Sequence, residues 1–386
     1  MSRRPVARAL WGAVLASFAV SLMISYIDHR RHAFGDLSHG SKSDHFTHMH
    51  AARLFPRFGF RLHRQPASSF LESLEHNDEK LSRLSVDDRA QSIACGRGAW
   101  SVAGARPAYL NWSQLPRPYP PGDMLLFAPV AMLYEWTPIS FAVTNWLLIV
   151  TCLIVAHVGL YLMWQTVHET WILSSAARWA ICVLLAIPVI WFSLDGFYDG
   201  VLIAPLVLTA RWLHASKWTC AVLAFALAVF CHYRALVFAP YALVAMVGVA
   251  RSIRVLSRAD VARLLLAATL AAFAAYTFIL VAPSLRDFPL TNPVHPAIGH
   301  PLATAAVVTF AMLAATLLWR LQSPLDAAIA ATIFGFLLAI RQVQIWHVVA
   351  IMPWIVAPLA KGMLSSWWPR LIRAASVGVV YLVLTS

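Results

Sequence analysis

Long apolar runs alternate with short polar connections along most of this chain. The first run covers residues 9–27 and follows a basic start that contains Arg3, Arg4 and Arg8. It is long enough to cross the hydrocarbon core of a bilayer as a helix, and it lacks the small-residue pattern of a cleavage site. We therefore expect residues 1–27 to form an uncleaved transmembrane anchor.

The remaining apolar runs predict a bundle of spanning helices. Spans are expected at residues 138–164, 177–193, 200–214, 218–232, 235–250, 262–282, 302–319, 325–340, 347–360 and 371–385. With the anchor they make about eleven crossings, because about 20 apolar residues cross a bilayer. The sequence therefore predicts an all-α polytopic membrane protein.

A large polar loop, residues 28–117, follows the first span. After it, residues 119–136 are apolar but few, and they begin with two prolines, which is typical of a re-entrant or interfacial helix. We divide the chain into the anchor at 1–27, a first extracytoplasmic region at 28–136 with juxtamembrane and re-entrant helices, and a multi-spanning domain at 137–386.

Composition supports a membrane protein. The chain has 386 residues, of which 60% are hydrophobic and 12% charged, and its mean hydropathy is +0.67. A soluble domain carries about 25% charged residues. The net charge of +13 would suggest nucleic acid as the partner of a soluble protein. Here arginines at cytoplasmic helix ends, in contact with lipid headgroups, explain it, and no nucleic acid is expected.

The distribution of arginines predicts the orientation. The connection at 250–263 holds Arg251, Arg254, Arg258 and Arg263, whereas the short connections predicted on the opposite side, at 194–199, 232–234, 283–301 and 341–346, hold at most one arginine each. Basic residues concentrate in short cytoplasmic loops. We therefore expect a cytoplasmic N-terminus, with the loop at 28–117 on the outer face.

This topology gathers small polar clusters on the outer side. They are Asp28, Asp36 and Asp44 with nearby histidines; Asp195 and Asp199; His232, Tyr233 and Arg234; Arg286 and Asp287 with His295 and His300; and Arg341, Gln342, Gln344 and His347. Any single member is explained by interfacial anchoring. Because they recur at most outer turns, they indicate a shared vestibule for a substrate that has a phosphate and a polar body.

Asp44 carries the most local information. Apolar residues recur at helical spacing from Phe46 to Phe55, so an amphipathic helix on the membrane surface is expected there. Asp44 lies in its first turn, where it, or Ser43 beside it, would cap the helix. The functional alternative is a carboxylate that faces the vestibule and accepts a proton from a sugar hydroxyl.

Metal and disulfide chemistry are weakly indicated. His45, His48 and His50 have a spacing that metal sites use, but the chain has no carboxylate-His-x-x-x-His zinc motif, and we predict no metal and no cofactor. Four of the five cysteines lie in or beside apolar runs, and Cys95 is alone in the loop, so small buried thiols are expected rather than disulfides.

Four motifs resemble the GT-C superfamily of glycosyltransferases that use polyprenyl-phosphate sugars, with the bacterial α-1,2-mannosyltransferase-like branch nearest. They are Asp44, Phe46, Ala51, Leu54 and Gly59 after the first span; Tyr119-Pro120-Pro121 leading into Leu125 to Pro129; Pro188 followed by Asp195 to Gly200; and Gln344 to His347 leading into Pro353-Trp354. The chain departs from that branch at Asp195-Gly196, where Gly-Gln is usual, and at Arg234-Ala235, where a Lys-Pro pair is usual.

The resemblance implies a GT-C-like fold and an inverting sugar transfer, with mannose as the sugar. Asp44 would be the catalytic base, and Arg234, Arg341 and His347 would neutralise the leaving phosphate. The full expected substrate-binding set is His45, His48, Tyr119, Asp195, Asp199, His232, Tyr233, Arg234, Arg341, Gln342 and His347. Asp28 and Asp36 remain competitors for the base.

The implied partners are a polyprenyl-phosphate-linked donor, a glycan or glycolipid acceptor and membrane lipids, at the outer face of a bacterial inner membrane. Two other classes remain open. A transporter or lipid flippase would show repeats and charges at mid-membrane, which the sequence lacks. An O-antigen-type polymerase shares outer arginines, but its large loop falls late in the chain, whereas here it comes first.

Overall fold

The computed structural model describes residues 3–31, 44–65, 119–170, 174–194 and 198–286. Every regular element within these ranges is a helix. They are α1 (Arg3–Arg31), α2 (Asp44–Phe58), η1 (Gly59–His63), α6 (Gly122–Trp136), α7 (Phe141–Thr170), α8 (Ser175–Leu194), η3 (Tyr198–Leu202), α9 (Ile203–His214), α10 (Trp218–Cys231), η4 (Tyr233–Phe238), α11 (Ala239–Arg251), η5 (Ile253–Val255) and α12 (Arg258–Arg286). The four spans predicted after residue 300 lie outside the described residues.

The helices have the lengths and composition of a helical membrane protein. Three of them are long and apolar enough to cross a bilayer, over Val6–Ile27, Val143–Glu169 and Arg258–Val281. Shorter apolar helices cover Ser175–Ile187, Gly200–Leu213, Trp218–Cys231 and Tyr241–Arg251. Hydrocarbon favours helices because only a helix satisfies its backbone polar groups within one segment.

One predicted span is interrupted. The apolar run at 235–250 forms a 3-10 turn, η4, before α11 begins at Ala239. Pro240 lies in the first turn of α11. Proline lacks a backbone N–H and fixes φ, so it suits the first turn of a helix and disfavours an uninterrupted helix across this position.

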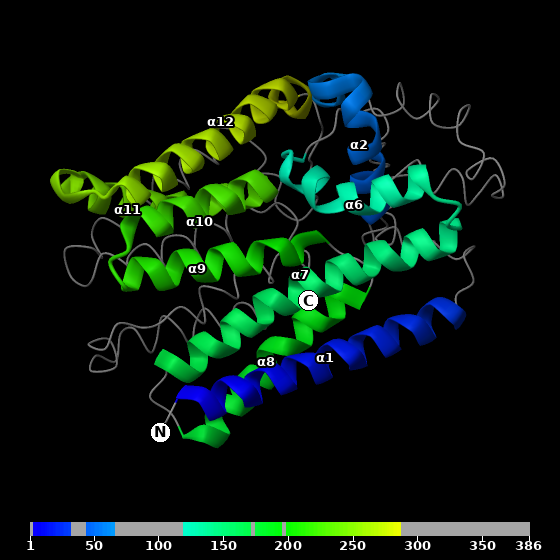
Figure 1. Cartoon of the computed structure of the whole chain (residues 1–386), viewed down its shortest axis with the longest axis horizontal. Coiled ribbons are helices and arrows are strands. Elements are labelled where there is room, and N and C mark those ends of the chain that lie inside the picture. Colours follow the sequence, from blue (N-terminus) through cyan, green and yellow to red (C-terminus); the bar gives the residue numbers. More distant parts are fainter. Residues whose placement is uncertain (1–2, 32–43, 66–118, 171–173, 195–197, 287–386) are drawn as a thin grey trace, which may run out of the picture.

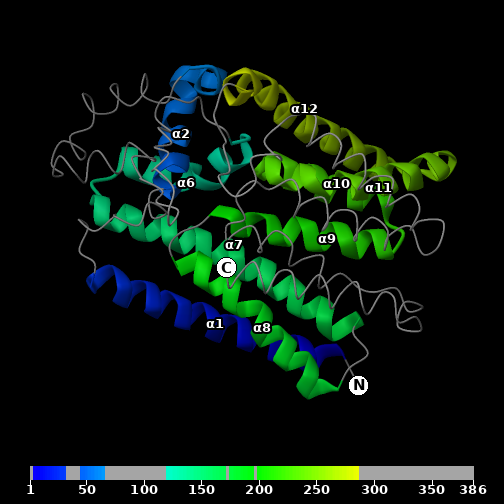
Figure 2. The same ribbon diagram turned by 180° about the vertical axis from the view of Figure 1, so that it is seen from behind.

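The helices run alternately in opposite directions (Figure 1). Tyr26 near the end of α1 contacts Trp146 near the start of α7, and Trp11 stacks on Tyr161, so α1 and α7 are antiparallel. α9 packs on α7, α10 packs on α9 and α12 packs on α10, as the view from behind also shows (Figure 2). The bundle therefore has an N-terminal end, where α1 begins, and an opposite end, which we call the α2 end.

Several arginines gather at the N-terminal end. Arg211, Arg251 and Arg263 all lie at the N-terminal end, at the close of α9, the close of α11 and the start of α12. At this end Arg211 donates to Gln165 (3.0 Å) and to Glu169 (2.7 Å) near the close of α7. The helices thus bring the arginine-rich connections together at one end of the bundle.

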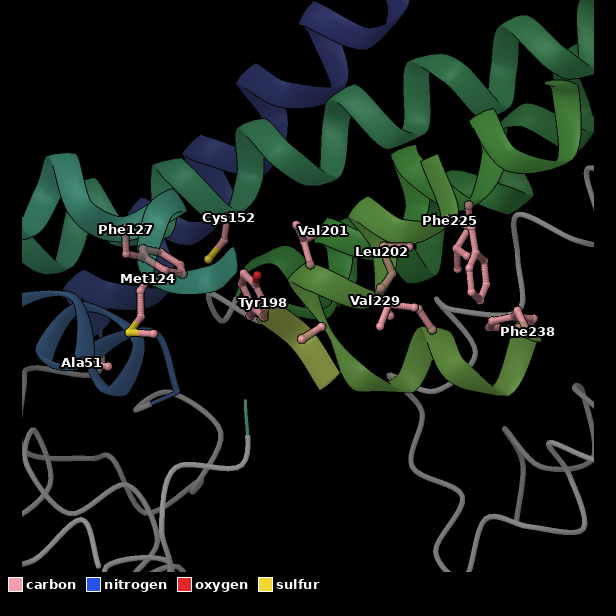
Figure 3. Close-up of a cluster of buried hydrophobic side chains, with 14 of the residues drawn as sticks. Ala51, Met124, Phe127, Cys152, Tyr198, Val201, Leu202, Phe225, Val229 and Phe238 are labelled. Carbon is pink, nitrogen blue, oxygen red and sulfur yellow. The ribbon is translucent and has the colours of Figure 1, made fainter. Parts of the chain in front are cut away.

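Among the described residues, two apolar cores hold the bundle together. One lies between α1, α7, α8 and α9 and includes Leu10, Leu160 and Val189. The other joins α2 and α6 to the α9–α10 layer, and Figure 3 shows Met124 and Phe127 of α6 beside Ala51 of α2, with Tyr198 of η3 nearby. Apolar packing therefore docks α2, which belongs to the large first loop, onto the helical bundle.

Candidate functional site

The most unusual feature of the α2 end is a buried ionisable pair. Nδ1 of His48 in α2 contacts Oδ2 of Asp123 in α6, and the two side chains are 1% and 0% exposed. A buried carboxylate is costly unless it is hydrogen-bonded. Asp123 meets that requirement twice, because its Oδ1 also accepts the backbone N–H of Met124 at 2.7 Å. It lies in the first turn of α6, where the helix dipole favours an acid.

Aromatic rings enclose His48. Tyr119 lies edge-on to the imidazole at 4.6 Å between ring centres, Tyr198 is tilted at 4.5 Å, and Phe127 is stacked at 5.5 Å. His232 adjoins the same group, and the centre of its ring lies 5.5 Å from that of the Tyr119 ring. We call the following set the His48 cage: His48, Tyr119, Asp123, Phe127, Tyr198 and His232.

The cage joins segments that are far apart in sequence. Tyr198 of η3 donates its hydroxyl to the carbonyl of Cys231 at 3.0 Å, which ties η3 to the last turn of α10. Gly122, at the start of α6, packs directly on the same turn, since a Cβ there would lie 2.5 Å from the carbonyl oxygen of Phe230. Only glycine permits this approach. The beginning of α6 is therefore fixed against the end of α10.

A second polar contact joins α2 to α6. Arg53 donates from Nε to Glu135 at 2.5 Å, and its guanidinium lies 4.5 Å from the ring centre of Tyr134. Arg53 also contacts Nδ1 of His50 at 3.1 Å. Its side chain is 5% exposed, whereas that of Glu135 is 47% exposed. This contact thus closes the α2–α6 interface near its solvent-accessible edge.

Three predicted site residues meet in the cage: His48, Tyr119 and His232. Tyr233 turns elsewhere, because its hydroxyl contacts Thr277 of α12 at 2.5 Å and its ring contacts Phe278. The structure therefore separates Tyr233 from its neighbour His232.

The other predicted residues are described in backbone position only or not at all. Asp44 and His45 open α2, Asp199 lies in η3 and Arg234 in η4. Asp28, the competitor for the base, lies near the close of α1. Asp36, Asp195, Arg341, Gln342 and His347 lie outside the described residues. Asp44 is the first residue of α2 and precedes His48 by one helical turn.

Sequence reasoning missed Asp123, Tyr198 and Phe127. A signal for Asp123 was present, because an acid that follows Pro-Pro-Gly at the head of an apolar segment is typical of a helix start. Its partner could not be found this way, since His48 lies 75 residues earlier. Nothing local marks the two tyrosine rings of the cage as neighbours.

The cage has the parts of an acid–base site. A carboxylate that accepts from Nδ1 of a histidine fixes the tautomer and orientation of the ring, an arrangement that acid–base sites use. Within the described ranges, no group of three histidine, cysteine, aspartate or glutamate side chains is arranged to hold a metal ion. Comparisons with family models, curated proteins and solved structures find no match to this chain. Fold and site together define a helical membrane protein with a buried histidine–carboxylate pair at one end of its bundle.

Proposed function

We propose that this protein is an integral-membrane glycosyltransferase of GT-C type. It moves a sugar, mannose by the resemblance of its motifs, from a polyprenyl-phosphate donor to a glycan or glycolipid acceptor, with inversion at the anomeric carbon. The α2 end faces the outside of a bacterial inner membrane, and the N-terminal end faces the cytoplasm. The arginines gathered at the N-terminal end support this orientation.

The observation that carries the proposal is the convergence of three segments at the α2 end. α2 begins with Asp44, and His48 one turn later packs against Tyr119, which in turn packs against His232. Arg234 follows His232 by two residues, in η4. The candidate base therefore lies four residues before one member of the cage, and the candidate phosphate ligand lies two residues after another.

The chemistry assigns one task to each of these groups. Asp44 accepts the proton of an acceptor hydroxyl, and the hydroxyl oxygen forms a bond to the anomeric carbon of the donor sugar. The bond between that carbon and the phosphate oxygen breaks, and the electron pair leaves with the polyprenyl phosphate. Arg234 stabilises the departing anion, because guanidinium is permanently charged and matches phosphate oxygens in geometry.

The test is release of polyprenyl phosphate by the purified protein, given polyprenyl-phosphate mannose and octyl α-mannoside. Asp44→Asn is expected to lower the rate by about 10²–10⁴-fold, the usual contribution of a general base. Asp28→Asn and Asp36→Asn are the matched controls, because they make the same change in the same region of the chain. Both controls should retain wild-type rates.

Two outcomes would contradict the proposal. If Asp28→Asn or Asp36→Asn abolishes release and Asp44→Asn does not, the base is misassigned. If reconstituted vesicles move a solute without any sugar donor and no transfer is detected, the protein is a transporter.

A further inference from the structure

Two contacts of unequal burial dock α2 on α6. Arg53 and Glu135 meet where the Glu135 side chain is 47% exposed, so water reaches its carboxylate, whereas the Arg53 side chain is only 5% exposed. His48 and Asp123 meet where both side chains are almost fully buried. Removing one member of a buried pair leaves the other uncompensated, so this contact is much the harder to break. His48–Asp123 is therefore the polar contact that, together with the apolar packing of α2 on α6, defines where α2 sits.

Asp123 is itself held in place. Its Oδ1 accepts from the backbone of Met124, which fixes the carboxylate relative to its own helix. The residue before it, Gly122, packs so closely on α10 that an added Cβ would lie 2.9 Å from the Cα of Cys231. The position of Asp123 therefore follows the last turn of α10.

The position of the start of α2 depends in turn on the position of Asp123. His48 takes its position from Asp123, and Asp44 precedes His48 by one turn of the same helix. A rigid helix transmits any displacement of His48 to Asp44. The chain continues from α10 through His232 into η4, which carries Arg234. A continuous set of contacts thus links the segment of Asp44 to the segment of Arg234.

We propose that Asp123 is a positioning residue: through His48 it fixes the start of α2, and with it Asp44, relative to the turn that carries Arg234. The chemical consequence rests on the function proposed above, whereas the docking of α2 does not. In that reaction the base and the phosphate ligand act on opposite sides of one anomeric carbon. A misplacement of about 1 Å can lower such a rate about 10²-fold.

The first variant is Asp123→Asn. It keeps Oδ1 as the acceptor for Met124 and replaces the oxygen that faces His48 with an amide N–H. The bond to the carboxylate is lost, and His48 can keep only a neutral bond, in which its Nδ1 changes tautomer and accepts from the amide. The matched control is Glu135→Gln, which makes the same change of charge on the same helix, at an acid that is 47% exposed and whose amide replacement still offers an oxygen to Arg53. The readouts are kcat and KM for polyprenyl-phosphate mannose, together with hydrogen exchange of the amides of α2 and α10.

Asp123→Asn should lower kcat about 100-fold with KM unchanged, because a displaced base slows the chemical step and leaves donor binding intact. It should speed exchange across α2 at least tenfold and leave α10 as in the wild type. Glu135→Gln should match the wild type in all these measurements. His48→Phe keeps a ring in the cage but removes the donor, and should repeat the Asp123→Asn pattern. The double variant should be no worse than either single variant, as expected of two partners in one contact.

Several results decide the matter. Wild-type kcat and wild-type exchange of α2 in both Asp123→Asn and His48→Phe would overturn the proposal, as would faster exchange spread equally over α7, α9 and α10, since that is general destabilisation. If Asp123→Asn does not fold, His48→Phe alone decides by the same criteria. If the wild type transfers no sugar but Asp123→Asn still loosens α2 alone, the docking role of Asp123 stands and the glycosyltransferase function falls.

Discussion

The closest approach between two elements of the site occurs at Gly122, and it makes a quantitative prediction. In Gly122→Ala, the new Cβ would lie 2.5 Å from the carbonyl oxygen of Phe230 and 2.9 Å from the Cα of Cys231. Both are backbone atoms in the last turn of α10, so no side chain can rotate away. Since carbon atoms pack best at about 3.5–4.0 Å, α6 and α10 must separate by about 1 Å.

The loss of folding stability follows from that displacement. Overpacking a well-packed site costs about 1–3 kcal/mol. Alanine recovers up to about 1 kcal/mol of this, because glycine loses more conformational entropy in a helix. Gly122→Ala should therefore be destabilised by about 1–2 kcal/mol. The measurement is denaturant unfolding of the detergent-solubilised protein, followed by far-ultraviolet circular dichroism.

Gly12 supplies the matched control. It lies in α1, and a Cβ there would meet nothing within 4 Å. Gly12→Ala should therefore be about 0.5–1 kcal/mol more stable than the wild type, from helix propensity alone. If Gly122→Ala proves as stable as Gly12→Ala, the close packing of α6 on α10 is wrong, and the fixed position of Asp123 is wrong with it.

Two hydrogen bonds inside the bundle give further predictions, measured by the same unfolding experiment. Ser17 contacts Nε2 of His157 at 3.2 Å between α1 and α7, and Ser17→Ala should cost about 0.6 kcal/mol, the average for such bonds within a membrane. A decrease in the free energy of unfolding above about 2 kcal/mol would mean that Ser17 makes a further stabilising interaction. Trp164 donates its indole N–H to the carbonyl of Cys182 at 2.7 Å between α7 and α8. Trp164→Phe should cost about 0.5–1.5 kcal/mol, the net value of a neutral hydrogen bond, because the Cys182 carbonyl keeps its bond within α8, and an unchanged midpoint would refute that contact.

Much of the helical architecture could be predicted from apolar runs, because a bilayer leaves the backbone few alternatives to the helix. The run expected at 218–232 corresponds to α10, Trp218–Cys231. The amphipathic pattern that begins near Asp44 corresponds to α2, Asp44–Phe58. Hydropathy could not predict the division at η4, since Val237 and Phe238 continue the apolar run. The position of Pro240 decides where α11 starts, and a proline changes mean hydropathy little.

The candidate site was less predictable, for a physical reason. His48, Tyr119 and His232 could be selected because each is a polar or amphipathic residue near a predicted outer turn. Their neighbours depend on which turns meet, and that is decided by packing between helices rather than by local sequence. Gly122 shows this well: its lack of a side chain matters only because the end of α10 lies against it. The pairing of His48 with Asp123 depends on the same approach.

The short helix α6 also determines at which end of the bundle each later turn of the chain lies. Its 15 residues extend about 22 Å, less than the thickness of about 30 Å that a span must cross. It starts against the last turn of α10 and leads into α7, whose first turns lie beside the end of α1 through Tyr26 and Trp146. If α6 crossed the bundle, α7 would have to begin at the N-terminal end and run parallel to α1. Because α7 runs antiparallel to α1 instead, the basic turns after α9 and α11 fall at the same end as the N-terminus, and the His48 cage falls at the other.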